Sequence, residues 1–576
     1  MDIRRTILLM IFSLSLLMLW SNWQAHESKL APLAVKSPVS VTAATPTTLD
    51  KSGAPVTNTV GNTTANAAGS VSATGTGVTG AKELIVVKTD VLKLTFDLHG
   101  AELIQADLLN YPLTANSEMP TPLLQHKDGH IYIVQSGLVG APGTSNLPTY
   151  ASNFKLASDS LELKGDTLKV SFAAEASGVT LTKSFTFHRG SYAIHVDHSI
   201  DNQTTADISP ELFLQITRDG QPADQQSTSA SWLPGWLGGV SSGPASFIGP
   251  AIYTDEHKYE KFTFSEIEKS KEKNKPIKQT ANDGWFALIQ HYFLTAWVPT
   301  KGVARHVAIV EHDKNLFSVN SIQSAGLIPA GKAVTIPATL WVGPQDQNAL
   351  EAIAPGLDQV VDYGMLSIIA KPVFSLLTWI HKLIGNWGWS IIALTVLIKA
   401  AFYPLSAASY RSMAKMKQVS PRLQALKEKF GDDRQKLNTA MMEMYRTEKI
   451  NPLGGCVPIV IQIPVFLSLY NVLLNSVELR GAPWIFWVQD LAVQDPYFIL
   501  PAIMMGTMFL QMRLNPKPPD PVQAKVMMFM PLVFGGMMFF FPAGLVLYWC
   551  INNTLSIAQQ WYITRKLTTA ANDPVK

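Results

Sequence analysis

The sequence contains very little cysteine, and the two cysteines present do not suggest a disulfide framework or a metal site. Only Cys456 and Cys550 occur in 576 residues, each in or beside an apolar run, and there is no CxxC or Cys/His cluster. A disulfide scaffold is therefore excluded, and neither a metal nor another cofactor is expected. The net charge of +3 is too small to indicate recognition of a specific nucleic-acid sequence.

The signatures of common catalytic sites are also missing. There is no GxSxG, HExxH or Walker loop, and the apolar runs hold no pair of carboxylates, so no catalytic residue is predicted. A transporter that uses an intramembrane lysine is an alternative, but the internal repeats common in transporter folds are not visible. His195 and His198 do not predict a metal site, because residues three apart in a strand point to opposite faces.

Residues 1–82 are predicted to form a membrane anchor and a tether. Arg4-Arg5, the apolar run Ile7–Trp20 and Trp23 are compatible with a cleaved signal peptide or a retained anchor. The interfacial tryptophans and the lack of a good cleavage site favour a retained transmembrane anchor at residues 1–24. Residues 25–82 are poor in charge and in bulky side chains, which predicts a flexible tether.

Residues 83–346 alternate apolar and polar side chains in the manner of β-strands. The pattern is clear in Leu92–Leu98 and again in Tyr192–His198. Because such segments are short and separated by turn residues, they predict a large all-β sandwich domain.

Residues 347–385 are predicted to be a linker followed by an amphipathic helix. Lys371, Ser375, Thr378 and Lys382 form a polar stripe at helical spacing, and apolar side chains occupy the rest of this helix. A helix of this kind lies in the membrane interface rather than crossing the membrane.

The long apolar runs are concentrated in the last 200 residues and predict the remaining membrane spans. Span 2 is expected at residues 386–405 and spans 3–6 at 454–564, with a reversal at Pro542-Ala-Gly544. Several of these runs hold only 15–17 apolar residues, which suggests a locally thin bilayer.

The distribution of cations predicts the topology. Ser406–Pro452 holds ten Lys/Arg against five Asp/Glu, and Arg565-Lys566 open the tail at residues 565–576. By the positive-inside rule, both segments and the N-terminus are cytoplasmic. The fold class expected is a multi-pass α-helical membrane protein with six spans, a β-sandwich outside the cytoplasm and both termini inside.

The basic segment at residues 406–453 is predicted to be a cytoplasmic helical hairpin. Its first helix carries apolar residues that step by 3, 4, 3 and 4, as in a heptad seam: Met416, Val419, Leu423, Leu426 and Phe430. Asp433 follows a break and is placed to cap the second helix. A structural hairpin and a mobile basic arm that meets ribosomes or nascent chains are both compatible with this spacing.

Lys399 is a cation inside the apolar run of span 2. Its insertion costs about 2.5–3.5 kcal/mol unless the ammonium reaches water or a partner. The side chain could snorkel toward the end of the span. Thr395, Lys399, Tyr403 and Ser406 nevertheless fall on one face of a single helix, which favours a polar, water-lined stripe in the interior.

Other spans carry polar stripes as well. Ser468, Asn471 and Asn475 share a face of the third span, with Gln462 nearly opposite, whereas Tyr548, Asn552, Ser556 and Gln559 line the sixth. Such stripes either bond helices to one another or enclose a wet groove with Lys399. Methionines crowd the fourth and fifth spans, which suits a surface that accepts many apolar partners.

Five short motifs stand out in the second half of the chain: Leu340-Trp-Val-Gly-Pro344, Met413-Ala-Lys-Met416, Asn451-Pro-Leu-Gly-Gly-Cys456, Ser476-Val-Glu-Leu-Arg480 and Phe541-Pro-Ala-Gly-Leu-Val-Leu-Tyr548. Together they resemble the YidC family of membrane protein insertases of Gram-negative bacteria. The resemblance implies an insertase and chaperone of the bacterial inner membrane, with the β domain in the periplasm, rather than an enzyme. It implies nascent membrane proteins as substrates. Other implied partners are the bilayer, the ribosome, and the Sec translocon with its SecD and SecF subunits.

The resemblance also implies a hydrophilic groove within the membrane. The family's usual groove cation is an arginine, and Lys399 occupies the matching position, while Trp549 stands where many relatives have a tyrosine. The candidate groove residues are Lys399, Thr395, Tyr403, Gln462, Ser468, Asn471, Tyr548, Trp549 and Asn552.

Overall fold

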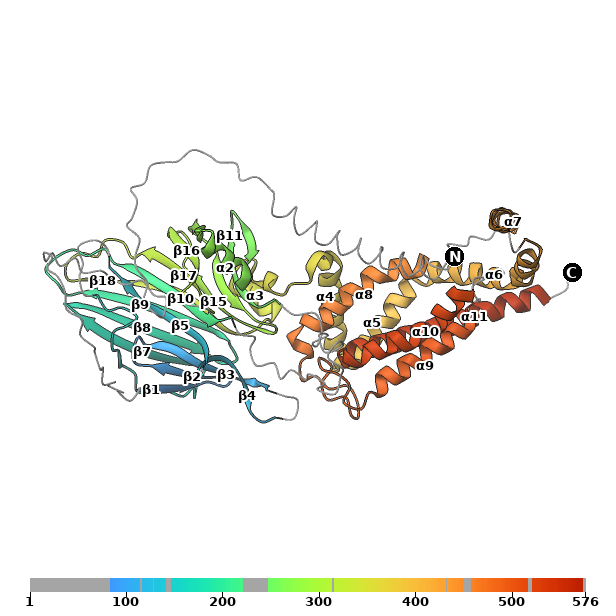
Figure 1. Cartoon of the computed structure of the whole chain (residues 1–576). Helices are drawn as coiled ribbons and strands as arrows, with labels where there is room; N and C mark the ends of the chain where they lie inside the picture. The colour runs from blue at the N-terminus through green and yellow to red at the C-terminus, as the bar shows by residue number, and fades with distance from the viewer. Residues whose placement is uncertain are drawn as a thin grey trace, which may run out of the picture.

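The structure is a computed structural model that describes residues 83–113, 117–127, 129–140, 147–220, 247–312, 315–430, 433–448, 457–515 and 521–572. The predicted anchor at residues 1–24 and the tether at 25–82 lie outside these ranges. Figure 1 shows two parts, a β domain and a group of helices beside it.

The β domain consists of two nine-stranded antiparallel sheets. The first has the order β1 (Leu84–Lys88), β2 (Leu92–Asp97), β3 (Glu102–Pro112), β4 (Pro120–Lys127), β5 (His130–Val139), β10 (Glu211–Asp219), β17 (Leu316–Ser324), β16 (Arg305–Glu311) and β13 (Ile277–Ala281). The second has the order β12 (Lys258–Lys261), β11 (Gly249–Thr254), β14 (Trp285–Ile289), β15 (Phe293–Pro299), β18 (Lys332–Pro344), β9 (Ala193–Asn202), β8 (Val179–His188), β7 (Thr167–Ala176) and β6 (Lys155–Leu156). The short helix α2 (Phe264–Glu272) joins β12 to β13.

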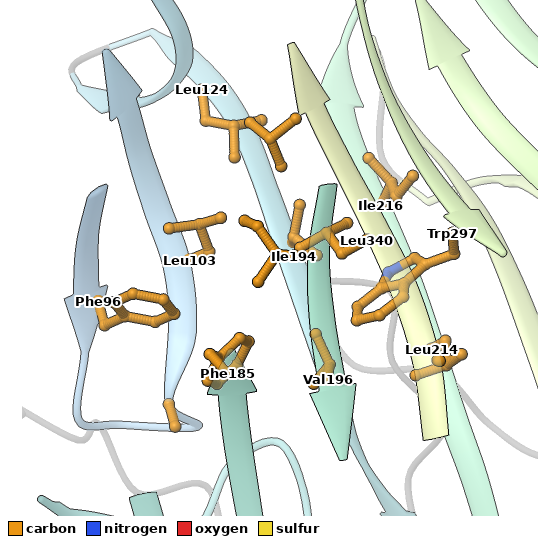
Figure 2. Close-up of a cluster of buried hydrophobic side chains, with 14 of the residues drawn as sticks. Phe96, Leu103, Leu124, Phe185, Ile194, Val196, Leu214, Ile216, Trp297 and Leu340 are labelled. Atoms are coloured by element: carbon orange, nitrogen blue, oxygen red, sulfur yellow. The ribbon is translucent and has the colours of Figure 1, made fainter. Parts of the chain in front are cut away.

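The alternating pattern of the sequence becomes the core between the two sheets. In β9, Ile194, Val196 and Ile200 are buried, whereas His195 between them is exposed. Figure 2 shows side chains of both sheets meeting in this core, among them Phe96, Leu103, Leu214 and Ile216 of the first sheet and Phe185, Ile194, Val196, Trp297 and Leu340 of the second. The large β domain expected from period-two alternation is confirmed.

One member of β9 makes the stability of this domain depend on pH. His198 is fully buried, and its Nε2 lies 3.0 Å from the Ser136 hydroxyl. Burial, helped by the nearby Lys183 ammonium, lowers the pKa of His198 from 6.5 to about 3. Between these values the unfolded chain binds a proton that the folded chain does not, so stability is lost as pH falls from about 6.5 toward 3.

We expect His198→Gln to flatten this acid dependence. From pH 7 to pH 5 the histidine should cost the wild type about 2 kcal/mol of unfolding free energy, at 1.36 kcal/mol per pKa unit. Burial raises the pKa of Glu102 to about 7, which acts in the opposite direction, so the variants must be compared with one another. Thermal unfolding in detergent at several pH values measures the difference, with exposed His195→Gln as control. Parallel pH profiles for His198→Gln and wild type would contradict the prediction.

After β18 the chain becomes helical. The elements are α3 (Gln347–Ile353), η1 (Leu357–Val360), η2 (Gly364–Leu366), α4 (Ser367–Ile384), α5 (Trp387–Ala401), α6 (Tyr403–Phe430), α7 (Arg434–Thr447), α8 (Val457–Asn475), η4 (Val477–Leu479), α9 (Ile499–Leu514), α10 (Pro521–Met537), η5 (Met538–Phe540) and α11 (Ala543–Asn572). Buried side chains of α4, α5, α8, α9 and α11 form one apolar cluster that continues into β11, β14, β15 and β18. The β domain is thus packed against the helices.

Helix α4 presents three kinds of surface. Phe374, Leu377 and Ile380 are buried, and the predicted stripe from Lys371 to Lys382 is largely exposed. A third face exposes large apolar side chains, including Ile368, Trp379 and Leu383. Side chains of this kind beside a polar face are typical of a helix in the membrane interface.

The prediction of a single helix across residues 386–405 is wrong. Helix α5 ends at Ala401, and α6 starts at Tyr403 with a bend of 67° between the two. Pro404 explains the break, because it has no N–H for the carbonyl of Ala400 and its ring clashes there. Tyr403 and Ser406 therefore do not continue the face of Thr395 and Lys399 in a straight line.

Helix length alone does not establish six spans. Within the part of the chain that the structure describes, α4 is the one helix both long and apolar enough to cross a membrane, or one of two if the bent α5–α6 pair is a single span. Helix α9 and residues 525–540 are apolar but shorter. The 15 residues of α5 extend only about 22 Å at 1.5 Å per residue. A helix break is present where the reversal is expected, since α10 and η5 end before Pro542 and α11 starts at Ala543.

Helices α6 and α7 form the hairpin expected between span 2 and span 3. The Asp433 carboxylate accepts a hydrogen bond from the Lys436 backbone amide and caps α7. Val419 of the proposed seam is buried, and Leu423 and Leu426 are half-buried. In Figure 1, this hairpin and the C-terminal end of α11 lie at the end of the molecule opposite the β domain.

Candidate functional site

A small pocket with both polar and apolar side chains in its lining lies where α5, α6, α8 and α11 come together. Its volume is about 30 Å³, and it is lined by Ile398, Lys399, Phe402, Leu405, Ser406, Gln462, Val465 and Asn552. This volume is enough for one or two water molecules. The bend between α5 and α6 helps to form the pocket, because Phe402, Leu405 and Ser406 belong to the bend or follow it.

Lys399 is the only cation in the lining of this pocket. Its Nζ donates a hydrogen bond of 2.7 Å to the Ser556 hydroxyl on α11. Among the residues that the structure describes, no carboxylate forms an ion pair with Lys399. The ammonium is therefore held by a neutral partner, and its charge is not cancelled locally.

The partners of Lys399 extend the network to α8. The Ser556 hydroxyl donates to the carbonyl of Asn552, one helical turn earlier, at 2.7 Å. The Asn552 side chain in turn accepts a hydrogen bond of 2.6 Å from Gln462 Nε2. These hydrogen bonds, one of them to the Asn552 backbone carbonyl, join α5, α8 and α11 beside the pocket.

The structure brings three of the nine candidate residues together, namely Lys399, Gln462 and Asn552. Two others, Thr395 and Ser468, are not part of the pocket lining, and their hydroxyls bond to their own helices. Thr395 Oγ1 donates to the Ile391 carbonyl at 2.6 Å, and Ser468 Oγ donates to the Pro464 carbonyl at 2.8 Å.

The remaining four candidates are not part of the pocket lining. Tyr403 is exposed at the start of α6. Tyr548 is buried in the apolar cluster, and its side chain also forms a hydrogen bond with Gln462 of the lining. The Trp549 ring packs on Phe534 and Phe466, with the latter ring centroid 4.8 Å away, and so serves packing between helices.

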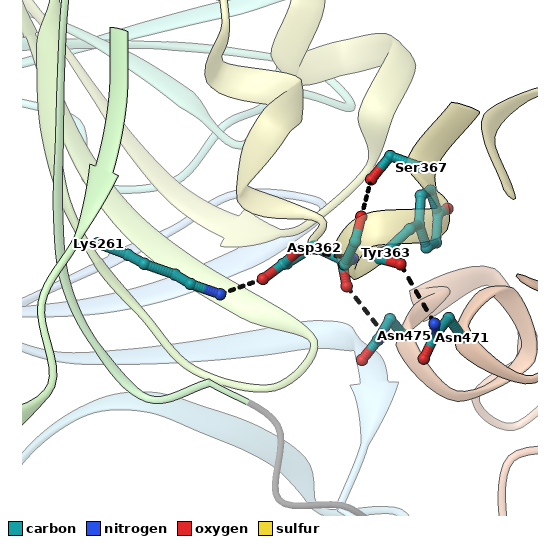
Figure 3. Close-up of polar contacts among 7 residues, drawn as sticks. Lys261, Asp362, Tyr363, Ser367, Asn471 and Asn475 are labelled. Carbon is teal, nitrogen blue, oxygen red and sulfur yellow. Dashed lines mark hydrogen bonds and ion pairs between the residues drawn. The ribbon is translucent and has the colours of Figure 1, made fainter. Parts of the chain in front are cut away.

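Asn471 belongs to a different contact set, at the junction with the β domain (Figure 3). Asn471 and Asn475 on α8 donate to the backbone carbonyls of Tyr363 and Asp362, at 3.2 and 3.3 Å. The Asp362 carboxylate also pairs with Lys261 of β12. Burial raises the pKa of Asp362, but hydrogen bonds from Lys261 and the Gly364 amide outweigh burial and lower it overall.

Two more contacts fix the same junction. Arg480 donates to the carbonyls of Pro112 and Leu113, at 3.1 and 3.3 Å. His291 Nε2 donates to the Leu474 carbonyl at the end of α8, at 3.1 Å. The loop after α8 is therefore attached to both sheets of the β domain.

Ser556 is the residue that the candidate set omitted. The signal was present, because Ser556 follows Asn552 by four residues and Tyr548 by eight on α11. Helical spacing gave the shared face but not which members of that face point toward Lys399.

Two family models cover most of the described chain. Residues 84–376 match the YidC periplasmic domain, and residues 379–570 match the 60Kd inner membrane protein family. The membrane protein insertase YidC of Bordetella petrii is 57% identical over 577 residues, which cover 99% of each chain. The corresponding protein of Paraburkholderia phytofirmans is 45% identical over 98% of this chain and 99% of that protein.

A solved structure of an active YidC insertase, with its first transmembrane domain resolved, aligns with 84% of this chain and 93% of that chain, at 16% identity and a TM-score of 0.37. The assignment rests on the sequence matches instead. Both parts of the chain match the same family, in the order expected for a periplasmic domain followed by a membrane region. The chain therefore belongs to the YidC family of membrane protein insertases of the inner membrane, which are not enzymes.

Proposed function

We propose that this chain inserts nascent membrane proteins through a hydrophilic groove that includes the Lys399 pocket. The observation that carries the proposal is an ammonium held by a neutral hydroxyl in a polar pocket between helices. A polar environment lowers the cost of moving a short polar tail partway across the bilayer. The uncancelled charge attracts acidic residues in that tail.

The apolar part of the substrate leaves sideways into the lipid. Helix α10 exposes apolar side chains on which such a segment could slide, among them Met528, Phe529, Met530 and Val533, and α9 exposes Phe509 and Leu510. Flexible methionines suit varied apolar partners. Partition of the substrate helix into the bilayer supplies the driving force.

Within this proposal the insertase works both alone and with the Sec translocon, including SecD and SecF. The basic hairpin and the tail meet the ribosome. The position of the hairpin at the far end from the β domain (Figure 1) supports a cytoplasmic location for it. Both termini are cytoplasmic, and the chain crosses the membrane six times.

Reconstitution separates this function from solute transport. Liposomes that contain the purified protein are expected to protect the translocated tail of a small single-span substrate from added protease, whereas empty liposomes should not. The same liposomes should show no flux of small solutes above the empty control. Flux without tail protection would favour the transporter instead.

Topology can be tested with single cysteines in a variant that lacks Cys456 and Cys550. Phe486 and Tyr497 are strongly exposed in the loop before α9, and cysteines there should react with an impermeant thiol reagent added to intact cells. Cysteines at Met442 in the hairpin and at Thr569 should react only after the membrane is opened. Reaction of the Thr569 cysteine in intact cells would mean an odd number of spans.

A further inference from the structure

The lysine in the pocket needs an acceptor that fixes its position. A lysine ammonium is a point charge on a flexible stem, whereas an arginine presents a rigid planar fork. Without a partner, the Lys399 side chain would sample several rotamers, and its charge would be spread over the pocket. Among the described residues, Ser556 is the one whose side chain accepts a hydrogen bond from Lys399 Nζ.

The hydrogen bonds of Ser556 leave its oxygen available as an acceptor. A serine hydroxyl has one hydrogen and two lone pairs. The hydrogen is donated to the Asn552 carbonyl at 2.7 Å, so a lone pair is left for the Lys399 ammonium, also at 2.7 Å. Tyr410 of α6 forms a side-chain hydrogen bond with the same residue. Ser556 is buried, so water does not compete freely for these positions.

The backbone around Ser556 is fixed from a second direction. Asn552 supplies the backbone carbonyl that accepts from Ser556. Its side chain also accepts a hydrogen bond from Gln462 on α8. Rotation of α11 about its axis would break both this bond and the bond to Lys399. Helices α5, α6 and α11 thus meet at the Ser556 hydroxyl, and α8 is joined to them through the Asn552 side chain.

The neutrality of this acceptor matters for function. A carboxylate at the same place would also hold the ammonium, but it would cancel the positive charge that attracts acidic residues of the substrate. We propose that Ser556 is a positioning residue that orients Lys399 without neutralising it and so sets the preference for acidic substrate tails. This inference rests on the proposed function of Lys399.

The test uses the full-length protein in liposomes and two versions of one single-span test substrate. The translocated tail carries two aspartates in one version and two asparagines in the other, and protease protection gives the insertion rates. Ser556→Ala should lower the rate for the aspartate tail about fivefold, as for the net loss of one ordinary hydrogen bond, and should change the asparagine tail little. Ser556→Thr should restore the rate to within about twofold of wild type, because it keeps the hydroxyl.

Two further variants make the outcome decisive. Thr554→Ala removes a similar bond on α11, from Thr554 Oγ1 to the Cys550 carbonyl at 2.7 Å, at an exposed position, and should leave the ratio of the two rates unchanged. On a Lys399→Ala background, Ser556→Ala should have no additional effect on that ratio.

The results distinguish the two ideas. Equal losses for both tails in Ser556→Ala, or a normal ratio in Ser556→Ala when Lys399→Ala abolishes the preference, would overturn the role of Ser556 alone. A normal ratio in Lys399→Ala would overturn the proposed function and this inference together.

Discussion

Replacing Lys399 by alanine is expected to reduce insertion of substrates with acidic tails by about tenfold or more. Two unit charges 4 Å apart interact by about 4 kcal/mol at an effective dielectric constant of 20. Desolvation of the tail offsets much of this attraction. We expect a net attraction of about 1.4 kcal/mol, which corresponds to a factor of ten in the insertion rate. Lys399→Arg keeps the charge and should retain most of the activity.

The measurement is insertion of a panel of substrates in a strain depleted of its own insertase, at matched expression of each variant. Substrates with neutral tails serve as the internal control, and they should be affected much less than acidic ones. Equal insertion of the whole acidic panel by wild type and Lys399→Ala would contradict a role for the charge.

A second large effect is expected at Gly388, near the start of α5. A Cβ atom at this position would lie 2.2 Å from Trp484 Cδ1, well inside van der Waals contact. The tryptophan has little room to move, because the Asn386 side chain donates to the carbonyls of Pro483 and Trp484 at 3.1 and 3.2 Å. Gly388→Leu should therefore cost about 3 kcal/mol or more, at the upper end for overpacked cores.

Gly506 offers a matched control for that substitution. It is also a glycine inside a helix, α9, but it is exposed, and nothing lies within 4 Å of its Cβ position. Thermal unfolding in detergent and the yield of folded protein should be close to wild type for Gly506→Leu and strongly reduced for Gly388→Leu. Similar losses in both variants would mean that helix propensity or membrane context, and not the Trp484 contact, controls the outcome.

The β domain and the helical breaks were predictable because they depend on local patterns. Alternation in segments such as Tyr192–His198 becomes alternate burial in a sheet, and Pro542 separates η5 from α11. The bend before Pro404 also has a local cause, the proline itself, although the polar residues on both sides of it have the spacing of one continuous helix.

The pocket was harder to predict, for a physical reason. Helical spacing shows which side chains share a face, but not how that face is rotated toward its neighbours. Hydroxyl groups add a second difficulty. Those of Thr395 and Ser468 donate a hydrogen bond to the backbone carbonyl four residues earlier, so they can be buried without a polar cavity. Gln462, which stood opposite the apparent stripe of span 3, is the α8 side chain that bonds to Asn552.

The junction with the β domain could not be predicted from the sequence, because it joins residues such as Arg480 and Pro112 that are far apart in the chain. Its chemistry has a consequence for the exchange of domains between relatives. Asn471, Asn475, His291 and Arg480 all donate to main-chain carbonyls, and every amino acid carries a carbonyl. The accepting segments can therefore diverge in side chains while the attachment persists, as long as the four donors and the path of the backbone are kept. A chimera that joins the helices of this chain to the β domain of a relative should keep these carbonyl contacts wherever the donors are present. The Lys261–Asp362 pair and the hydrogen bond from Arg480 to the Thr121 hydroxyl depend instead on side chains at both ends.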